Sequence, residues 1–176
     1  MLAASRHHVA RLRTHKDRKF TCVRASVEGC AAVPELLLVS HSTEKLSDDL
    51  PELNTMMVAL PQLDAGQSDV DTGILHRCVR QVEQQRSQHS TPIPGTFILE
   101  SRRPKWNPRT ETFELPFGGR ANWASARNFQ LVDRDGVPDR AVLLYGKMDE
   151  DEFALDFSYP LSVLHALSIV LTTWGW

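Results

Sequence analysis

Short apolar segments recur along the chain, separated by proline, glycine and charged residues, which is typical of a protein built from short strands. Several of these segments are rich in β-branched and aromatic residues, which favour extended structure. The segments 128–132 and 141–145 flank a turn-forming stretch at 133–138, which indicates a hairpin with a long loop. The strands that we expect lie at residues 19–23, 36–39, 56–60, 96–99, 112–115, 128–132, 141–145 and 153–157.

The segment from Leu161 to Trp174 has a different pattern, with apolar residues on every face of a helix. Pro160 suits the first turn of that helix and Gly175 suits its end. A helix that is apolar all round is expected to be buried all round, in a protein core or in a membrane. This one is short for a membrane span and interrupted by serine and threonine, so we expect antiparallel strands to surround it. A thinner apolar stripe predicts a second helix over 74–88.

Composition indicates one ordinary globular domain over residues 1–176, with a mass of 19.9 kDa. The chain has 20 basic and 22 acidic residues, which excludes a strongly basic nucleic-acid-binding protein as a bulk property but not a local basic patch. Cys22, Cys30 and Cys78 form no disulfide framework and favour a reducing compartment. The basic N-terminal region does not resemble a signal peptide, so we expect a soluble, non-secreted protein.

The charges are unevenly distributed, and this points to a partner. Residues 1–24 contain seven basic side chains against the single acid Asp17, and residues 147–156 contain five acids against the single base Lys147. A domain with one basic end and one acidic patch has a dipolar surface, and its basic end suits an anionic partner.

The C-terminal half carries a series of short sequence blocks. The blocks are Lys105-Trp-Asn107, Phe113-Glu-Leu-Pro-Phe-Gly-Gly-Arg120, Ala124-Ser-Ala-Arg-Asn-Phe-Gln130, Leu144-Tyr-Gly-Lys-Met148 and Glu152-Phe-Ala-Leu-Asp-Phe-Ser-Tyr-Pro-Leu161. This series resembles the C-terminal domain of the tubby family, with the blocks in the family's order and with nearly its spacing across residues 98–174. Shorter upstream stretches, at 11–13, 19–21 and 57–61, resemble family strands as well.

The resemblance implies a mainly β fold, a closed twelve-stranded antiparallel barrel threaded by an apolar C-terminal helix. Compared with that domain, this chain begins several strands in and stops a few residues after the helix. We therefore expect a partial domain, an incomplete antiparallel β-barrel around a central apolar helix, with unpaired strand edges.

The resemblance also implies a function without catalysis. Tubby domains bind phosphoinositides, chiefly phosphatidylinositol 4,5-bisphosphate, and are thereby tethered to the inner face of the plasma membrane. Family members also carry membrane-protein cargo toward cilia, and a nuclear, transcription-related role has been proposed for them. We accordingly expect a cytoplasmic, membrane-peripheral monomer, with no cofactor, that binds phosphoinositide headgroups.

Arg11 and Arg13 are the best candidates for headgroup binding. In a strand, positions i and i+2 share one face and lie about 6–7 Å apart, while Leu12 faces the other side. Arginine matches the geometry of phosphate oxygens, and the resemblance implies phosphate contacts at both positions. Lys16, Arg18 and Lys19 are expected to add electrostatic attraction to an anionic membrane. The alternative is that residues 1–24 form a solvated basic tail without fixed geometry.

Other features favour structural roles. We expect Asn128 and Phe129 to hold a turn and fill the core, and His165 to be a hydrogen-bonded core histidine of the buried helix rather than a ligand. Arg102, Arg103 and Lys105 form either a second basic patch or ordinary surface charge.

Catalytic and metal-binding constellations are not found in the sequence. His7, His8, His15 and Cys22 lack the tight pairing of a zinc site, and no nucleophile elbow or glycine-rich phosphate loop is present. The sequence therefore predicts a protein that is not an enzyme. Two other interpretations stay open: a protein- or DNA-interacting, transcription-associated module, and a degenerate fragment without a stable fold or lipid binding.

Overall fold

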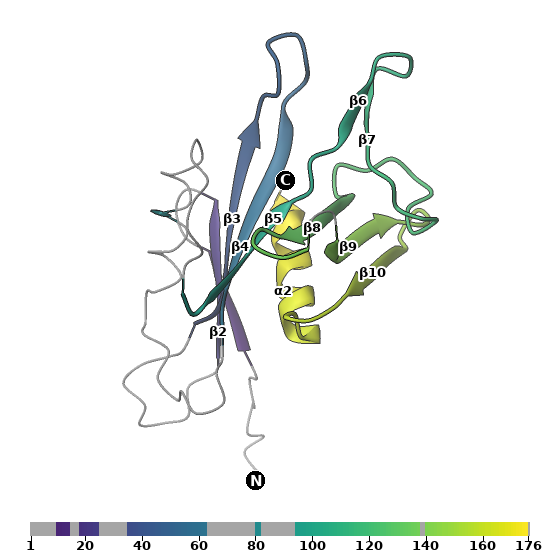
Figure 1. Ribbon diagram of the computed structural model, residues 1–176. Helices are drawn as coiled ribbons and strands as arrows, with labels where there is room; N and C mark the ends of the chain where they lie inside the picture. Colours follow the sequence, from purple (N-terminus) through teal and green to yellow (C-terminus); the bar gives the residue numbers. More distant parts are fainter. Residues whose placement is uncertain are drawn as a thin grey trace, which may run out of the picture.

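The computed structural model describes residues 10–14, 18–24, 35–62, 80–81, 94–137 and 140–175, with the backbone alone at positions 10, 11, 13, 23, 24 and 175. Strands dominate these residues, and one helix follows them near the C-terminal end (Figure 1). The strands are β1 (Ala10–Thr14), β2 (Lys19–Arg24), β3 (Glu35–Glu44), β4 (Leu53–Pro61), β5 (Thr96–Ser101), β6 (Lys105–Asn107), β7 (Thr112–Glu114), β8 (Phe129–Asp133), β9 (Ala141–Lys147) and β10 (Phe153–Phe157). The helix is α2 (Val163–Thr172), and the short 3-10 turn η1 (Thr173–Gly175) continues it.

One 8-stranded sheet contains all of these strands except β6 and β7, in the order β1-β2-β3-β4-β5-β8-β9-β10. Each neighbouring pair is antiparallel. β6 and β7 form a separate hairpin between β5 and β8 along the chain. The large sheet curls into half of a barrel, and α2 lies between its β2–β4 side and its β8–β10 side (Figure 1). The predicted incomplete antiparallel barrel with a C-terminal helix is confirmed.

The predicted strands are present, and two of them are longer than their apolar runs. β3 and β4 extend past those runs because their backbone ladder continues from the His41–Met56 pair to the Glu44–Leu53 pair. The predicted hairpin across residues 128–145 is also confirmed, since β8 pairs with β9. In the turn after β8, the side chain of Asp133 accepts a hydrogen bond from the backbone N–H of Asp135, a turn geometry typical of aspartate.

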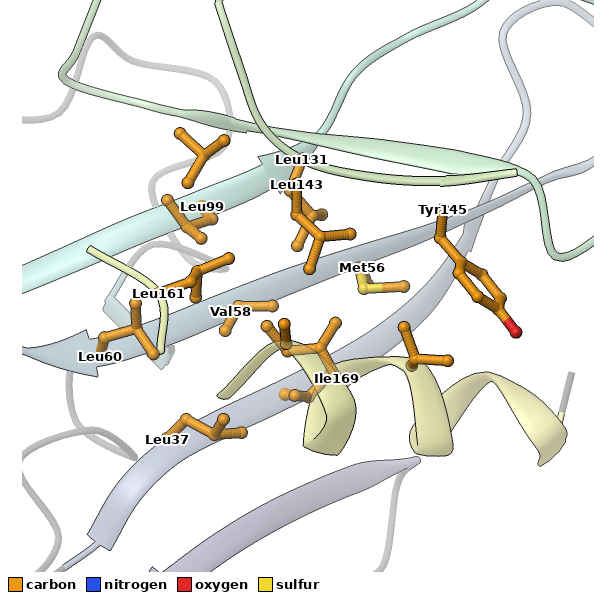
Figure 2. Packing of buried hydrophobic residues seen from close by; sticks show 14 of the residues in the cluster. Leu37, Met56, Val58, Leu60, Leu99, Leu131, Leu143, Tyr145, Leu161 and Ile169 are labelled. Carbon is orange, nitrogen blue, oxygen red and sulfur yellow. The ribbon is translucent and has the colours of Figure 1, made fainter. Parts of the chain in front are cut away.

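The core fills the concave side of the curled sheet. Alternate residues of the strands point inward, toward the helix, because successive side chains of a strand face opposite sides. Figure 2 shows residues from β3, β4, β5, β8 and β9 gathered around the helix. The side chains buried there include Leu37, Val39, Val58, Leu60, Leu99, Leu131, Leu143, Leu161, Ala166 and Ile169. The helix is therefore an integral part of the core, and both halves of the curled sheet contribute to its packing.

The helix begins at a capping box and is hydrogen-bonded to β2. Ser162 accepts a hydrogen bond from the backbone N–H of His165, whose Nδ1 accepts one from the backbone N–H of Ser162. The predicted hydrogen bonding of His165 is confirmed, but the residue is half-buried at the start of the helix rather than part of the core. Further along, Ser168 Oγ donates to Cys22 Sγ on β2, at 3.4 Å.

One expectation about the helix is wrong: its apolar residues are not buried on every side. Val163, Leu167, Leu171 and Trp174 are 61%, 48%, 57% and 61% exposed. They recur at the spacing of one helix face and form a stripe opposite the buried Ile169. The physical reason is that a half barrel covers only one side of a helix, so the described strands leave the other side open.

Several sequence-based expectations fall outside the described residues. The predicted helix over 74–88 does so except for residues 80 and 81, which are helical. His7, His8 and His15 lie outside as well, as do Cys30 and Cys78. Cys22, within the described part, is a buried free thiol.

Candidate functional site

The backbone of β1 carries both candidate arginine positions and is paired along its whole length with β2. Position 11 pairs with Val23, Leu12 with Cys22, and position 13 with Thr21. β2 pairs in turn with β3, so the candidate strand is joined to the body of the sheet. The structure therefore favours a fixed strand over a tail without geometry at residues 10–14. The side chains of Arg11 and Arg13, and Lys16 altogether, lie outside the described residues.

Leu12 sets the orientation of this strand. Its side chain is half-buried and packs against the hydrophobic core. Its partner across the ladder, Cys22, is 1% exposed and contacts Ser168 of the helix. The inward face of β1 at position 12 is thus anchored to the core and, through β2, to α2.

Arg18 and Lys19 stand at the start of β2, beside the end of β1. Arg18 is exposed and adopts a φ of 56°, a left-handed conformation that ends the turn between the two strands. Its carbonyl oxygen accepts a hydrogen bond of 3.0 Å from the backbone N–H of His41 on β3. Lys19 is half-buried and pairs with Ser40. This part of the basic end is therefore held in place by β3.

His41 shows how the basic end affects its surroundings. Burial, together with the smaller effect of the nearby Arg18 cation, lowers the pKa of His41 to about 4. Its Nε2 lies 2.8 Å from Thr172 Oγ1. Because that hydroxyl donates its own hydrogen to the carbonyl of Ile169, at 2.7 Å, Nε2 must carry the proton and donate it. His41 is therefore neutral near pH 7 and adds no charge to the site.

The second basic cluster, at Arg102, Arg103 and Lys105, lines a groove beneath the β6–β7 hairpin. Arg103 forms an ion pair of 2.8 Å with Glu44, and Arg102 donates to the side chain of Gln130 at 3.2 Å. Acidic side chains of the groove offset its basic ones. The structure thus favours ordinary surface charge here over a second anion site.

Two hydrogen bonds of Asn128 and one ion pair of Arg120 hold the loop between β7 and β8, and these contacts were not predicted from the sequence. Asn128 donates from its side-chain amide to the carbonyl of Trp123, at 2.7 Å, and accepts from the N–H of Lys147, at 2.8 Å. Arg120 binds the carboxylate of Asp156 through two nitrogens. Asn128 and the buried Phe129 therefore have the structural roles that we predicted. The Arg120–Asp156 pair has no local signal because its partners are far apart in the sequence.

Among the residues that the structure describes, no group of three or more histidine, cysteine or acidic side chains is arranged to hold a metal ion. No helix in the described part of the chain has the length and apolar character to cross a bilayer.

Comparison with known proteins identifies the family of this chain. Residues 2–175 match the Tub family. The chain is 33% identical over 144 residues to Tubby protein homolog 1 of Caenorhabditis briggsae. The aligned residues cover 79% of this chain and 32% of that relative. It is 41% identical over 87 residues to Protein king tubby 2 of Aedes aegypti, and the aligned residues cover 49% of this chain and 21% of that relative.

The matched segment spans about a third or less of the length of these curated relatives. The family match, by contrast, covers nearly all of this chain, and the observed half barrel with its C-terminal helix agrees with the fold that the resemblance implied. The chain belongs to the Tub family.

Proposed function

We propose that this chain is a non-catalytic phosphoinositide-binding module that attaches reversibly to the cytoplasmic leaflet of the plasma membrane. The observation that carries the proposal is the anchored strand β1, which is fully paired with β2 and has Leu12 packed on the core. Membership in the Tub family supports it, because binding of phosphoinositides is a general feature of that family.

The geometry of β1 suits a ligand with two phosphate groups. Leu12 packs inward, and from the alternation of a strand we expect positions 11 and 13 on the outer face. Their backbones are about 6–7 Å apart, which allows two guanidinium groups to contact two phosphates of one inositol ring. A strand held in a sheet presents these groups without the ordering cost that a free tail would incur.

Charges beside the strand strengthen the attraction to an anionic membrane. Lys16, Arg18 and Lys19 follow β1 directly, and each basic residue near an anionic leaflet contributes about 1 kcal/mol. The binding should therefore weaken at high ionic strength and after hydrolysis of the headgroup phosphates. Attachment of membrane-protein cargo and passage toward a cilium are consistent extensions of this role.

The test is flotation with vesicles that contain phosphatidylinositol 4,5-bisphosphate, at moderate salt. The double variant Arg11→Ala with Arg13→Ala should abolish measurable binding, since two hydrogen bonds to charged groups, at about 1.5–3 kcal/mol each, correspond to at least a hundredfold loss in affinity. The matched control is Arg109→Ala with Arg140→Ala, which removes the same charge from two exposed positions elsewhere.

The control variant should bind like the parent. Equal binding by the parent and the Arg11/Arg13 variant would show that the site is assigned wrongly. Equal binding of the parent to a DNA duplex and to these vesicles, with the same salt dependence, would instead favour the nucleic-acid-binding alternative.

A further inference from the structure

Arg18 has an unusual backbone conformation for its residue type. Its φ of 56° lies in the left-handed region, where a Cβ atom is crowded and where glycine or asparagine is the usual residue. Among the residues that the structure describes, Glu111 is the other non-glycine residue with a positive φ. The conformation of Arg18 therefore costs stability, and a glycine at the same position would avoid that cost.

Contacts of the Arg18 side chain within the fold do not offset this cost. The residue is exposed, so its side chain buries little apolar surface. In the described part of the chain, the ion pairs join other residues and leave the Arg18 guanidinium without an acidic partner. Strain of this kind is typical of functional sites, where a side chain has a partner outside the fold.

The backbone of Arg18 is nevertheless held firmly. Its carbonyl oxygen accepts a hydrogen bond of 3.0 Å from the backbone N–H of His41 on β3. The ring of His41 is in turn bonded to Thr172 on α2, with 2.8 Å between Nε2 and Oγ1. The turn is thus fixed to the sheet and the helix, and Arg18 presents its cation from a rigid base.

This rigid position lies beside the end of β1. The ladder between β1 and β2 ends at the pair of Thr14 and Phe20, and Arg18 precedes Phe20 by two residues. An extended residue spans about 3.3 Å, so the backbone of Arg18 is at most about 7 Å from that of Phe20. Arg18 therefore stands next to the strand that carries positions 11 and 13.

We propose that Arg18 is a third phosphate contact of the site on β1, and that the strained turn holds it there. The inference rests on the proposed function, because positions 11 and 13 supply the first two contacts. It assigns to Arg18 a direct contact, in which the guanidinium fork meets phosphate oxygens, rather than a general attraction to an anionic surface. The ligand is then a headgroup with three phosphate groups, the phosphodiester of the lipid included.

The first test measures stability and affinity in the same variant. Arg18→Gly should raise the melting temperature by about 2 °C, because glycine adopts the left-handed φ without crowding. It should weaken binding to vesicles with phosphatidylinositol 4,5-bisphosphate at least tenfold, as expected for the loss of one hydrogen bond between charged groups. Arg18→Asn, which also suits this φ, should weaken binding to the same extent.

Glu111→Gly is the matched control for the backbone. Glu111 is exposed, has a φ of 51° and lies in the turn between β6 and β7. The substitution relieves the same kind of strain away from the site, so it should raise the melting temperature similarly. Its affinity for the vesicles should stay within about twofold of the parent's, since it removes no phosphate contact.

The second test separates a direct contact from long-range attraction. Arg18→Lys keeps the charge but loses the fork, so it should bind the bisphosphate vesicles about fivefold more weakly than the parent. Both proteins should bind phosphatidylserine vesicles of equal total charge equally well. Soluble inositol 1,4,5-trisphosphate should show the same preference for the parent over Arg18→Lys, whereas inositol 4,5-bisphosphate, which lacks the third phosphate, should show none.

The outcomes distinguish this inference from the function on which it rests. Parental binding by Arg18→Lys, with binding lost in the Arg11/Arg13 variant, would overturn the third contact and leave the proposed function standing. Parental binding by the Arg11/Arg13 variant would overturn both. A lower melting temperature in Arg18→Gly would overturn the strained turn. Displacement of the trisphosphate by an equal concentration of inorganic phosphate would assign Arg18 to free phosphate and overturn the headgroup contact.

Discussion

Protonation of His41 should destabilise the fold as the pH falls, and the structure allows the size of the effect to be worked out. His41 is 5% exposed and donates from Nε2 to Thr172 on the helix. Its ring also meets Phe20 edge to face, with 5.3 Å between the centroids. A charge on this ring would be poorly solvated and would lie near the Arg18 cation, so the folded state resists protonation.

The direction and magnitude follow from the two pKa values. Burial lowers the pKa of His41 from 6.5 to about 4 in the folded state. The unfolded chain therefore takes up the proton first, and the stability is present above pH 6.5 and is lost as the pH falls toward 4. Linkage gives a loss of about 2 kcal/mol between pH 7 and pH 5 from this residue alone. Below about pH 4 the loss stops growing, because the folded state is then protonated too.

The assay compares urea unfolding of the parent with that of His41→Gln at pH 7 and pH 5. Glutamine keeps an N–H donor for Thr172 but does not titrate. The difference in the free energy of unfolding between the two proteins should shift by about 2 kcal/mol between these pH values, in favour of the variant at pH 5. His165, whose pKa burial also lowers, contributes equally to both proteins and cancels. An unchanged difference would refute the buried, neutral state of His41.

Further predictions concern packing and the loop before β8. Gly146→Ala should destabilise the fold by about 1–3 kcal/mol, because a Cβ there would collide with the backbone of Arg120 and come within 2.8 Å of Ala121 Cβ. Asn128→Ala should cost about 2 kcal/mol through the loss of two hydrogen bonds to backbone groups. Leu37→Ala, at a fully buried site, should cost about 2–5 kcal/mol by leaving a cavity. Thermal melts of each variant test these values, and a melting temperature equal to the parent's would contradict the assigned contact.

The strands and the curled architecture were accessible from the sequence because they depend on local patterns and on a series of family blocks. Short apolar runs between turn residues placed the strands, and the loop from 120 to 128 runs from the end of one family block to the start of the next. The burial of His41 could also have been predicted from the sequence. It follows Leu37 and Val39 at alternate positions of β3, which assigns it to the core face.

The exposed helix stripe was not predictable from the same pattern. An apolar residue at position 167 or 171 indicates that burial of the side chain would be favourable, but it does not indicate which part of the structure covers it. That depends on how far the sheet wraps around the helix, which is a property of the whole topology. The Arg120–Asp156 pair was missed for a related reason, since folding alone brings these distant positions together.

The candidate site was predicted in part. The sequence predicted that Arg11 and Arg13 lie on a strand, and the pairing of β1 with β2 agrees with that. The packing of Leu12 also agrees with the expected inward face. The contacts between the strand and a ligand depend on side-chain geometry and on the ligand itself, so they stay a prediction.

The most direct test of phosphoinositide binding is an amide NMR titration of the isotope-labelled chain with soluble inositol 1,4,5-trisphosphate, the headgroup without its lipid. The account predicts saturable shifts concentrated at residues 10–14 and 18–24, absent in the Arg11→Ala, Arg13→Ala variant. Shifts confined to the groove beneath the β6–β7 hairpin, or no saturable shifts at all, would contradict it.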